Sequence, residues 1–164
     1  MTIRKSTPED LVAIMSIYEI ARQSMRQNGN STQWVNGYPQ RTLILDDISK
    51  GVHYCVCSDD GTPVAVFAFI VGDDPTYAEV QGQWMNNQPY GTIHRIGSNG
   101  QQKGILSEVV RWAFHHISNI RIDTHADNAP MLHLLSQQGF TYCGVIHVAD
   151  GTPRNAFQKV RPLQ

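Results

Sequence analysis

The sequence lacks the features that would place it in several broad classes of protein. Its 13 lysines and arginines are balanced by 14 acidic residues, and this net charge of −1 argues against a nucleic-acid partner. No apolar run approaches membrane-spanning length, since Val64–Val71 is only long enough for a strand. The opening residues, MTIRKSTPEDL, lack the apolar segment of a secretory signal. We therefore expect a cytoplasmic protein with neither a nucleic-acid nor a membrane partner.

Cysteine is also scarce, with 3 residues in the chain. Cys55 and Cys57 alternate on a predicted strand and Cys143 is distant, a pattern that favours reduced, buried thiols over a disulfide. We predict no metal site. A chain of 164 residues with 41% hydrophobic residues is long enough to bury a full core, so we expect one domain, 1–164. The sequence leaves a homodimer open.

Apolar spacing and turn signals predict an α+β protein. The expected helices, from their 3.6-residue spacing and their caps, span 11–25, 41–49, 104–117 and 131–138. The expected strands lie at 3–4, 52–58, 63–71, 77–84, 92–96, 120–124, 140–148 and 155–160. This order favours a mixed sheet with helices on both faces.

One stretch, Tyr90–Ile117, carries the clearest functional signal. An extended run ends at Gly97, and a glycine-bearing turn leads into a helix that starts near Gly104. Such a turn clusters free backbone N–H groups at the positive end of a helix dipole. The stretch therefore predicts a phosphate-binding turn.

Two motifs in this order resemble the GNAT acetyltransferase family. The first is Gln101-Gln102-Lys103-Gly104-Ile105-Leu106, which is similar to the family's Gln/Arg-x-x-Gly-x-Gly/Ala turn. The second is Asn128 followed eleven residues later by Gly139-Phe140. The resemblance covers Ile3 to Val160 and implies a mixed, mostly antiparallel central sheet with helices on both faces.

The resemblance also implies acetyl-CoA as cosubstrate. The backbone of the turn would bind the CoA pyrophosphate, the end of the preceding strand would pair with the pantetheine arm, and the asparagine would bond near the thioester. The residues so implied are His94, Arg95, Ile96, Gln101, Gln102, Lys103, Gly104, Ile105, Leu106, Ser107 and Asn128.

Three positions depart from the family pattern. Leu106 stands where a small residue is usual, and its side chain would crowd a phosphate unless it points into the core. Gln101 replaces the common arginine. Leu135 occupies the position of a tyrosine that often protonates the departing thiolate, and it cannot donate a proton. The last departure leaves three alternatives: another acid, unassisted departure of the thiolate, or binding without catalysis.

Four residues are candidates for proton transfer. Asp123 occupies the position of the family's base, and His125 follows it closely. His94 lies on the strand that leads to the turn, and Tyr142 would replace the missing acid if its strand turned it inward. Each also has a structural interpretation. Asp123 would form a salt bridge to Arg121 or Arg95, or cap a helix; the histidines would be hydrogen-bonded strand residues; and the tyrosine would be a packing residue.

The aromatic residues in the predicted loops are candidates for an acceptor pocket: Trp34, Tyr38, Tyr77, Trp84 and Tyr90. No acidic cluster accompanies them, which argues against a polycationic acceptor. The sequence thus predicts an N-acetyltransferase that transfers directly to a small amine or amino-acid-like acceptor. The alternative is a non-catalytic acyl-CoA-binding or regulatory module with the same fold.

Overall fold

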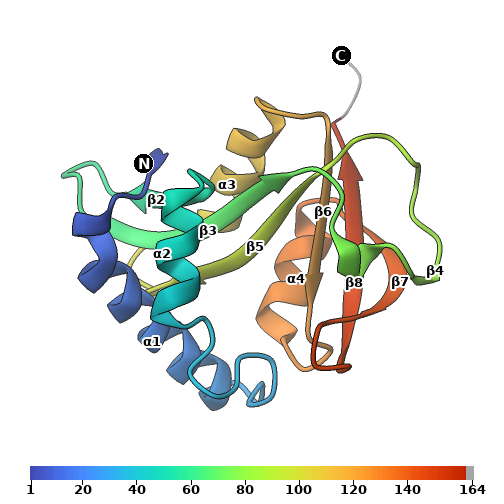
Figure 1. The fold of residues 1–164 in the computed structure, drawn as a ribbon, viewed down its shortest axis with the longest axis horizontal. Helices are drawn as coiled ribbons and strands as arrows, with labels where there is room; N and C mark the ends of the chain where they lie inside the picture. Colours follow the sequence, from blue (N-terminus) through green and yellow to red (C-terminus); the bar gives the residue numbers. More distant parts are fainter. Residues whose placement is uncertain (162–164) are drawn as a thin grey trace.

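A single eight-stranded sheet runs through the protein, whose computed structural model describes residues 1–161. The strands are β1 (Thr2–Lys5), β2 (His53–Cys57), β3 (Pro63–Val71), β4 (Gln81–Gly82), β5 (Gly91–Ser98), β6 (Asn119–Thr124), β7 (Thr141–His147) and β8 (Pro153–Val160). Their order across the sheet is β1-β2-β3-β5-β6-β8-β7-β4 (Figure 1). Within the described residues β5 and β6 are parallel, and the other neighbours pair antiparallel.

Two pairs of helices cover the two faces of this sheet (Figure 1). The helices are α1 (Leu11–Gln27), α2 (Arg41–Ser49), α3 (Ile105–Phe114) and α4 (Ala129–Gln137), with short 3-10 turns η1 (Pro8–Asp10) and η2 (Pro75–Tyr77). Apolar residues of α1 and α2 pack on one face, and those of α3 and α4 pack on the other. The predicted α+β class and its arrangement of helices are confirmed.

The first helix begins as the sequence predicts, with one refinement. Thr7 and Asp10 form a capping box, and Pro8–Asp10 make η1 before α1 continues from Leu11. Arg4 on β1 donates to both carboxylate oxygens of Asp10, at 2.7 and 2.9 Å. This contact ties the start of α1 to the edge of the sheet.

The predicted strand over 77–84 is wrong. The segment contains the end of η2 and the two-residue β4. Tyr77 and Trp84 lie 5.1 Å apart between ring centroids, and the indole Nε1 of Trp84 donates to the Tyr77 carbonyl. The apolar residues of this segment therefore belong to a loop. They contact one another through their side chains and do not alternate between two faces of a strand.

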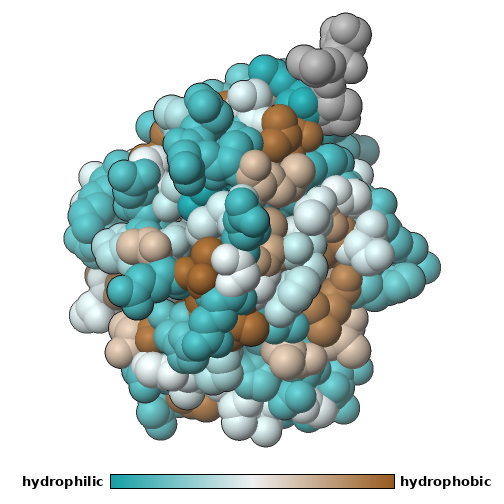
Figure 2. All heavy atoms as spheres, turned by 90° about the vertical axis from the view of Figure 1, so that its right-hand side faces the viewer, coloured by the Kyte–Doolittle hydropathy of each residue, from teal (hydrophilic) through white to brown (hydrophobic). Residues whose placement is uncertain are grey.

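No helix within residues 1–161 is long and apolar enough to cross a membrane. On the face of the molecule that carries β4 and β7, apolar residues form small patches separated by hydrophilic ones (Figure 2). Met85, Tyr142 and Val160 are among the exposed apolar side chains of the chain.

The feature of the sheet that positions the site is the separation of β5 from β6. These strands pair only at Gly91–Ile120 and Thr92–Arg121. Beyond those pairs β5 stays with β3 and β6 stays with β8, so their facing edges part. A bulge in β5 lies at the same place, where Arg95 has a φ of 51°.

Candidate active site

A cavity of about 630 Å³ opens where β5 and β6 separate. It is lined from both faces of the sheet, by the α1–α2 connection on one side and by the start of α4 on the other. His94, Arg95 and Ile96 of β5 face Ile122 and Asp123 of β6 across it. The unpaired strand edges there have backbone groups that are available to a ligand carrying amide groups.

Asp123, on β6, is one of the carboxylates that line this cavity. It is partly buried, lines the cavity, and accepts a hydrogen bond from the Tyr77 hydroxyl at 2.6 Å. Burial raises the pKa of Asp123, against the opposing influence of His94 and of the Tyr77 hydroxyl. A carboxylate with a raised pKa binds a proton more readily, which suits a general base.

A second acid behaves differently. Asp74, the cap of η2, accepts from His94 Nε2 at 2.7 Å and from the Thr76 hydroxyl at 2.7 Å. Burial alone would raise the pKa of Asp74, but the bonds from His94 and Thr76 outweigh it and lower the pKa to about 2. Asp74 therefore stays ionised and orients the imidazole of His94 on the cavity wall.

Neither predicted salt bridge of Asp123 forms. Arg95 forms a bidentate pair with the buried Asp47 of α2, with N–O distances of 2.9 and 3.0 Å. Arg121 lies between two aromatic rings, 4.0 Å from the centroids of both Trp84 and Tyr90. Both cations are thus engaged elsewhere, and Tyr77 bonds to Asp123 instead.

The sequence shows no acidic cluster near the aromatic loops, but four aspartates line this cavity. The lining includes Asp73, Asp74, Asp123 and Asp150, which come from three separate segments of the chain. The sequence could not show this grouping, because the fold brings together residues far apart in the chain. Arg154, also in the lining, donates to the Thr152 hydroxyl and to the backbone carbonyls of Pro153 and Gln33.

The predicted phosphate-binding turn precedes α3. Gly104 has a φ of 79° and is the N-cap residue, so the helix starts at Ile105. As at any helix start, the N–H groups of the first turn have no acceptor within the helix. Leu106 is 4% exposed and belongs to the core, so its side chain does not crowd this turn.

The residues present fit a CoA thioester. The free edge of β5 is suited to an amide-bearing arm. The start of α3 is suited to a pyrophosphate, and it lies outside the lining of this cavity. The Thr92 hydroxyl supports this fit, because it is buried on a residue that lines the cavity and has no hydrogen-bond partner among the described residues. Asn128 also lines the cavity, while its side chain caps α4 and donates to Thr124 and Gln33.

Two of the catalytic candidates lie outside the cavity lining. His125 follows the end of β6, where its Nδ1 accepts from the Asp127 amide and its Nε2 lies 2.9 Å from the Thr32 hydroxyl. Tyr142 is 55% exposed on β7, with its ring against Phe157. The structure thus brings together Asp123 and His94, and it turns Tyr142 toward solvent.

The aromatic candidates divide in the same way. Trp34 and Tyr38 line the cavity, with ring centroids 6.2 Å apart. Tyr77 and Tyr90 are buried behind it, and Tyr90 accepts a hydrogen bond from the Asp74 amide. Trp84 packs against Tyr77. Sequence reasoning missed Asp74, although the run Asp74-Pro75-Thr76 is a recognisable cap signal for a short helix.

Leu135 is completely buried in the core under α4. Its side chain belongs to the same apolar core cluster as Leu106. A tyrosine at this position would have to replace a packing residue. Any acid that protonates a leaving group in this cavity must therefore come from another position.

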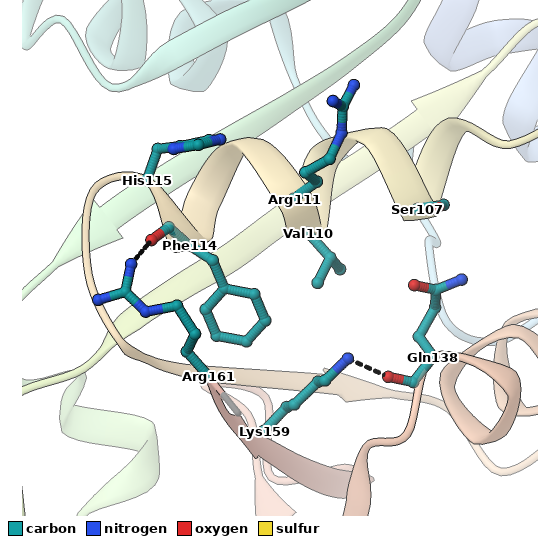
Figure 3. Close-up of a pocket in the computed structure, with 8 residues that line it drawn as sticks. All are labelled: Ser107, Val110, Arg111, Phe114, His115, Gln138, Lys159 and Arg161. Atoms are coloured by element: carbon teal, nitrogen blue, oxygen red, sulfur yellow. Dashed lines mark hydrogen bonds between the residues drawn. The ribbon is translucent and has the colours of Figure 1, made fainter. Parts of the chain in front are cut away.

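A second cavity, of about 350 Å³, lies between α3 and the C-terminal end of α4 (Figure 3). Its basic residues are already engaged. Lys159 donates to the Gln138 carbonyl and Arg161 to the Phe114 carbonyl, so each cation satisfies the end of a helix. These contacts stabilise the packing of the helices on β8, and the cavity is separate from the Asp123 site.

Comparison with solved structures shows what this fold and cavity belong to. A GNAT family acetyltransferase from Streptococcus agalactiae is 31% identical, with a TM-score of 0.88 over 99% of this chain and 96% of the other. GNAT family acetyltransferases from Listeria monocytogenes and Bacillus cereus are each 17% identical. The Listeria protein has a TM-score of 0.71, with 97% of this chain and 94% of that protein covered. The Bacillus protein has a TM-score of 0.63, with 99% of this chain and 98% of that protein covered. No protein-family model and no curated protein sequence matches.

The mixed, mostly antiparallel sheet of eight strands and its four helices match those of GNAT structures. The chain belongs to the GNAT family, and it is a GNAT acetyltransferase.

Proposed function

We propose that this acetyltransferase transfers the acetyl group of acetyl-CoA to the amine of a small, positively charged acceptor. The observation that carries the proposal is Asp123, a carboxylate with a raised pKa that lines the cavity beside the free edge of β5. Acetyl-CoA supplies the acetyl group as a reactive thioester. The amine nitrogen bonds to the acetyl carbon as the carbon–sulfur bond breaks, giving an amide and a free thiol.

Asp123 would accept the proton that the ammonium must lose before its nitrogen can attack. The Tyr77 hydroxyl holds this carboxylate in place by the 2.6 Å bond, and Tyr77 itself keeps its proton because burial and Asp123 raise its pKa. His94, oriented by Asp74, lies on the facing strand and would relay the proton to solvent or to the departing thiolate. This direct transfer proceeds without a covalent acetyl-enzyme intermediate.

The charge of the lining favours a cationic acceptor. Four carboxylates line the cavity against two arginines, Arg95 and Arg154, and Arg95 is already paired with Asp47, which lies outside the lining. The aromatic faces of Trp34 and Tyr38 are also suited to an alkylammonium group. We therefore expect an acceptor with more than one amine to be preferred over one that carries a carboxylate.

The test measures thiol release from acetyl-CoA with matched acceptors: 1,4-diaminobutane, butylamine and 4-aminobutanoate. The expected kcat/KM is highest for the diamine and lowest for the amino acid. Asp123→Asn should remove most of the activity, while Asp59→Asn, at an exposed aspartate on the distant β2–β3 turn, should leave it unchanged. A preference for 4-aminobutanoate would refute the cationic acceptor.

The alternative, an acyl-CoA-binding module, makes a different prediction in the same experiment. CoA would raise the Tm, as any ligand of the native state does, yet no amine in a broad panel would release thiol. Failure of CoA to raise the Tm would refute both functions.

A further inference from the structure

A buried chain of polar side chains connects the edge of the sheet to the bulge in β5. The Ser6 hydroxyl lies 3.2 Å from the Cys55 thiol and 2.7 Å from His53 Nδ1. His53 Nε2 lies 3.0 Å from the Tyr18 hydroxyl, which donates to the Arg95 carbonyl at 2.8 Å. Apart from Arg95, each of these residues is at most 6% exposed.

The direction of the hydrogen bonds from Ser6 to Arg95 follows from the acceptor at the end, the Arg95 carbonyl. The Arg95 carbonyl can only accept, so the Tyr18 proton is committed to it. His53 must then donate from Nε2 to Tyr18, which leaves Nδ1 to accept from the Ser6 hydroxyl. Burial lowers the pKa of His53 to about 4 and raises that of the Cys55 thiol to about 11, so both groups are neutral near pH 7.

The chain ends on a backbone group with an unusual conformation. Arg95 has a φ of 51°, and at this bulge Arg95 and Ile96 together stand opposite a single residue of β3. Its side chain is held by Asp47 of α2, so both its carbonyl and its guanidinium have buried partners. A positive φ is costly for a residue with a side chain and persists when surrounding contacts require it.

The peptide plane relates this carbonyl to the cavity. In a trans peptide the C=O of one residue and the N–H of the next point in opposite directions. With the Arg95 carbonyl turned to Tyr18 on α1, the Ile96 N–H is turned away from α1. Ile96 lines the cavity between β5 and β6.

We propose that Tyr18 and His53 are positioning residues, which hold the Arg95–Ile96 peptide so that the Ile96 N–H donates to the oxygen of the reacting acetyl group. This inference rests on the proposed function. A donor fixed before the reaction stabilises the charge that develops on that oxygen. Neither side chain touches the substrate, so both act through the backbone of the bulge.

The first test is kinetic. Tyr18→Phe removes only the hydroxyl, and it should lower kcat about tenfold with little change in the KM for the amine, less than the ~100-fold or greater loss when such a donor is removed outright. Ile14→Ala is the matched control, because it creates a cavity in the same core under α1. It should lower the Tm and leave kcat unchanged. Equal kcat values in wild type and Tyr18→Phe, or equal losses in both variants, would overturn the inference.

The second test needs acetyl-CoA binding but no acceptor. In the wild type, the Ile96 amide resonance should move downfield when acetyl-CoA binds, and in Tyr18→Phe this movement should be smaller. The ¹⁵N shifts of His53 should show the Nε2–H form, and His53→Gln, which keeps a donor near Nε2, should retain more activity than His53→Asn. An Ile96 amide that ignores bound acetyl-CoA refutes this inference alone, whereas loss of acetyl-CoA binding by the wild type refutes the proposed function.

Discussion

Replacing Asp123 by asparagine tests the proposed chemistry most directly. The substitution removes the group that would accept the ammonium proton, but an amide oxygen can still accept the 2.6 Å bond from Tyr77. The change in folding stability should therefore stay near 1 kcal/mol, the usual net value of one hydrogen bond. A lost general base costs about 10²–10⁴ in rate. We expect the lower end, about 10², because His94 lines the same cavity.

That loss corresponds to about 3 kcal/mol of transition-state stabilisation, at ~1.4 kcal/mol for each factor of ten. The assay is kcat/KM for the best diamine between pH 5 and 9, by thiol release. Asp123 must be ionised to act, so wild-type activity should fall as the pH is lowered through its raised pKa. The Asp123→Asn variant should lack this acidic limb.

Tyr77→Phe sharpens the same prediction. The Tyr77 hydroxyl lowers the pKa of Asp123, so its removal should move the acidic limb to higher pH while leaving the alkaline plateau largely intact. Activity of Asp123→Asn within threefold of the wild type would refute Asp123 as the base. So would an acidic limb in Asp123→Asn at the same pH as in the wild type.

Three further predictions concern stability. Asp47→Ala leaves a buried guanidinium on Arg95 without its partner, so it should lower the free energy of unfolding by about 3 kcal/mol and the Tm by roughly 6–12 °C. The double variant with Arg95→Met should recover part of this loss, and strictly additive effects of the two substitutions would contradict the pairing. The pKa of His53, lowered to about 4 by burial, means that the unfolded chain binds more protons between pH 6.5 and 4. Folding stability, measured by urea unfolding, should therefore fall by about 3 kcal/mol as the pH is lowered through that window, and His53→Gln should lose this slope; an unchanged slope would contradict it. Gly91→Ala places a Cβ 2.5 Å from Phe69 Cζ and should cost about 1–3 kcal/mol in thermal unfolding, and an unaltered Tm would show that the ring moves freely.

The sequence predicted the helices and most strands because caps, turns and apolar spacing each depend on residues close together in the chain. The caps at Thr7 and Asp127-Asn128-Ala129-Pro130, and the turn at Asp59-Asp60-Gly61, depend on residues within a few positions of one another. The prediction of a strand over 77–84 was wrong because the apolar residues there are placed by contacts with a distant strand, such as the bond from Tyr77 to Asp123.

By itself the sequence determined the sheet-and-helix order, the turn at Gly104 and the motifs that resemble the GNAT family, and it pointed to Asp123 and His94. Only the tertiary structure decided that Leu106 faces the core, that Tyr142 faces solvent, and that Asp74 orients His94. It also decided that carboxylates from distant segments share one cavity. The physical reason is that the side-chain direction and pKa of each residue depend on neighbours that only the completed sheet supplies.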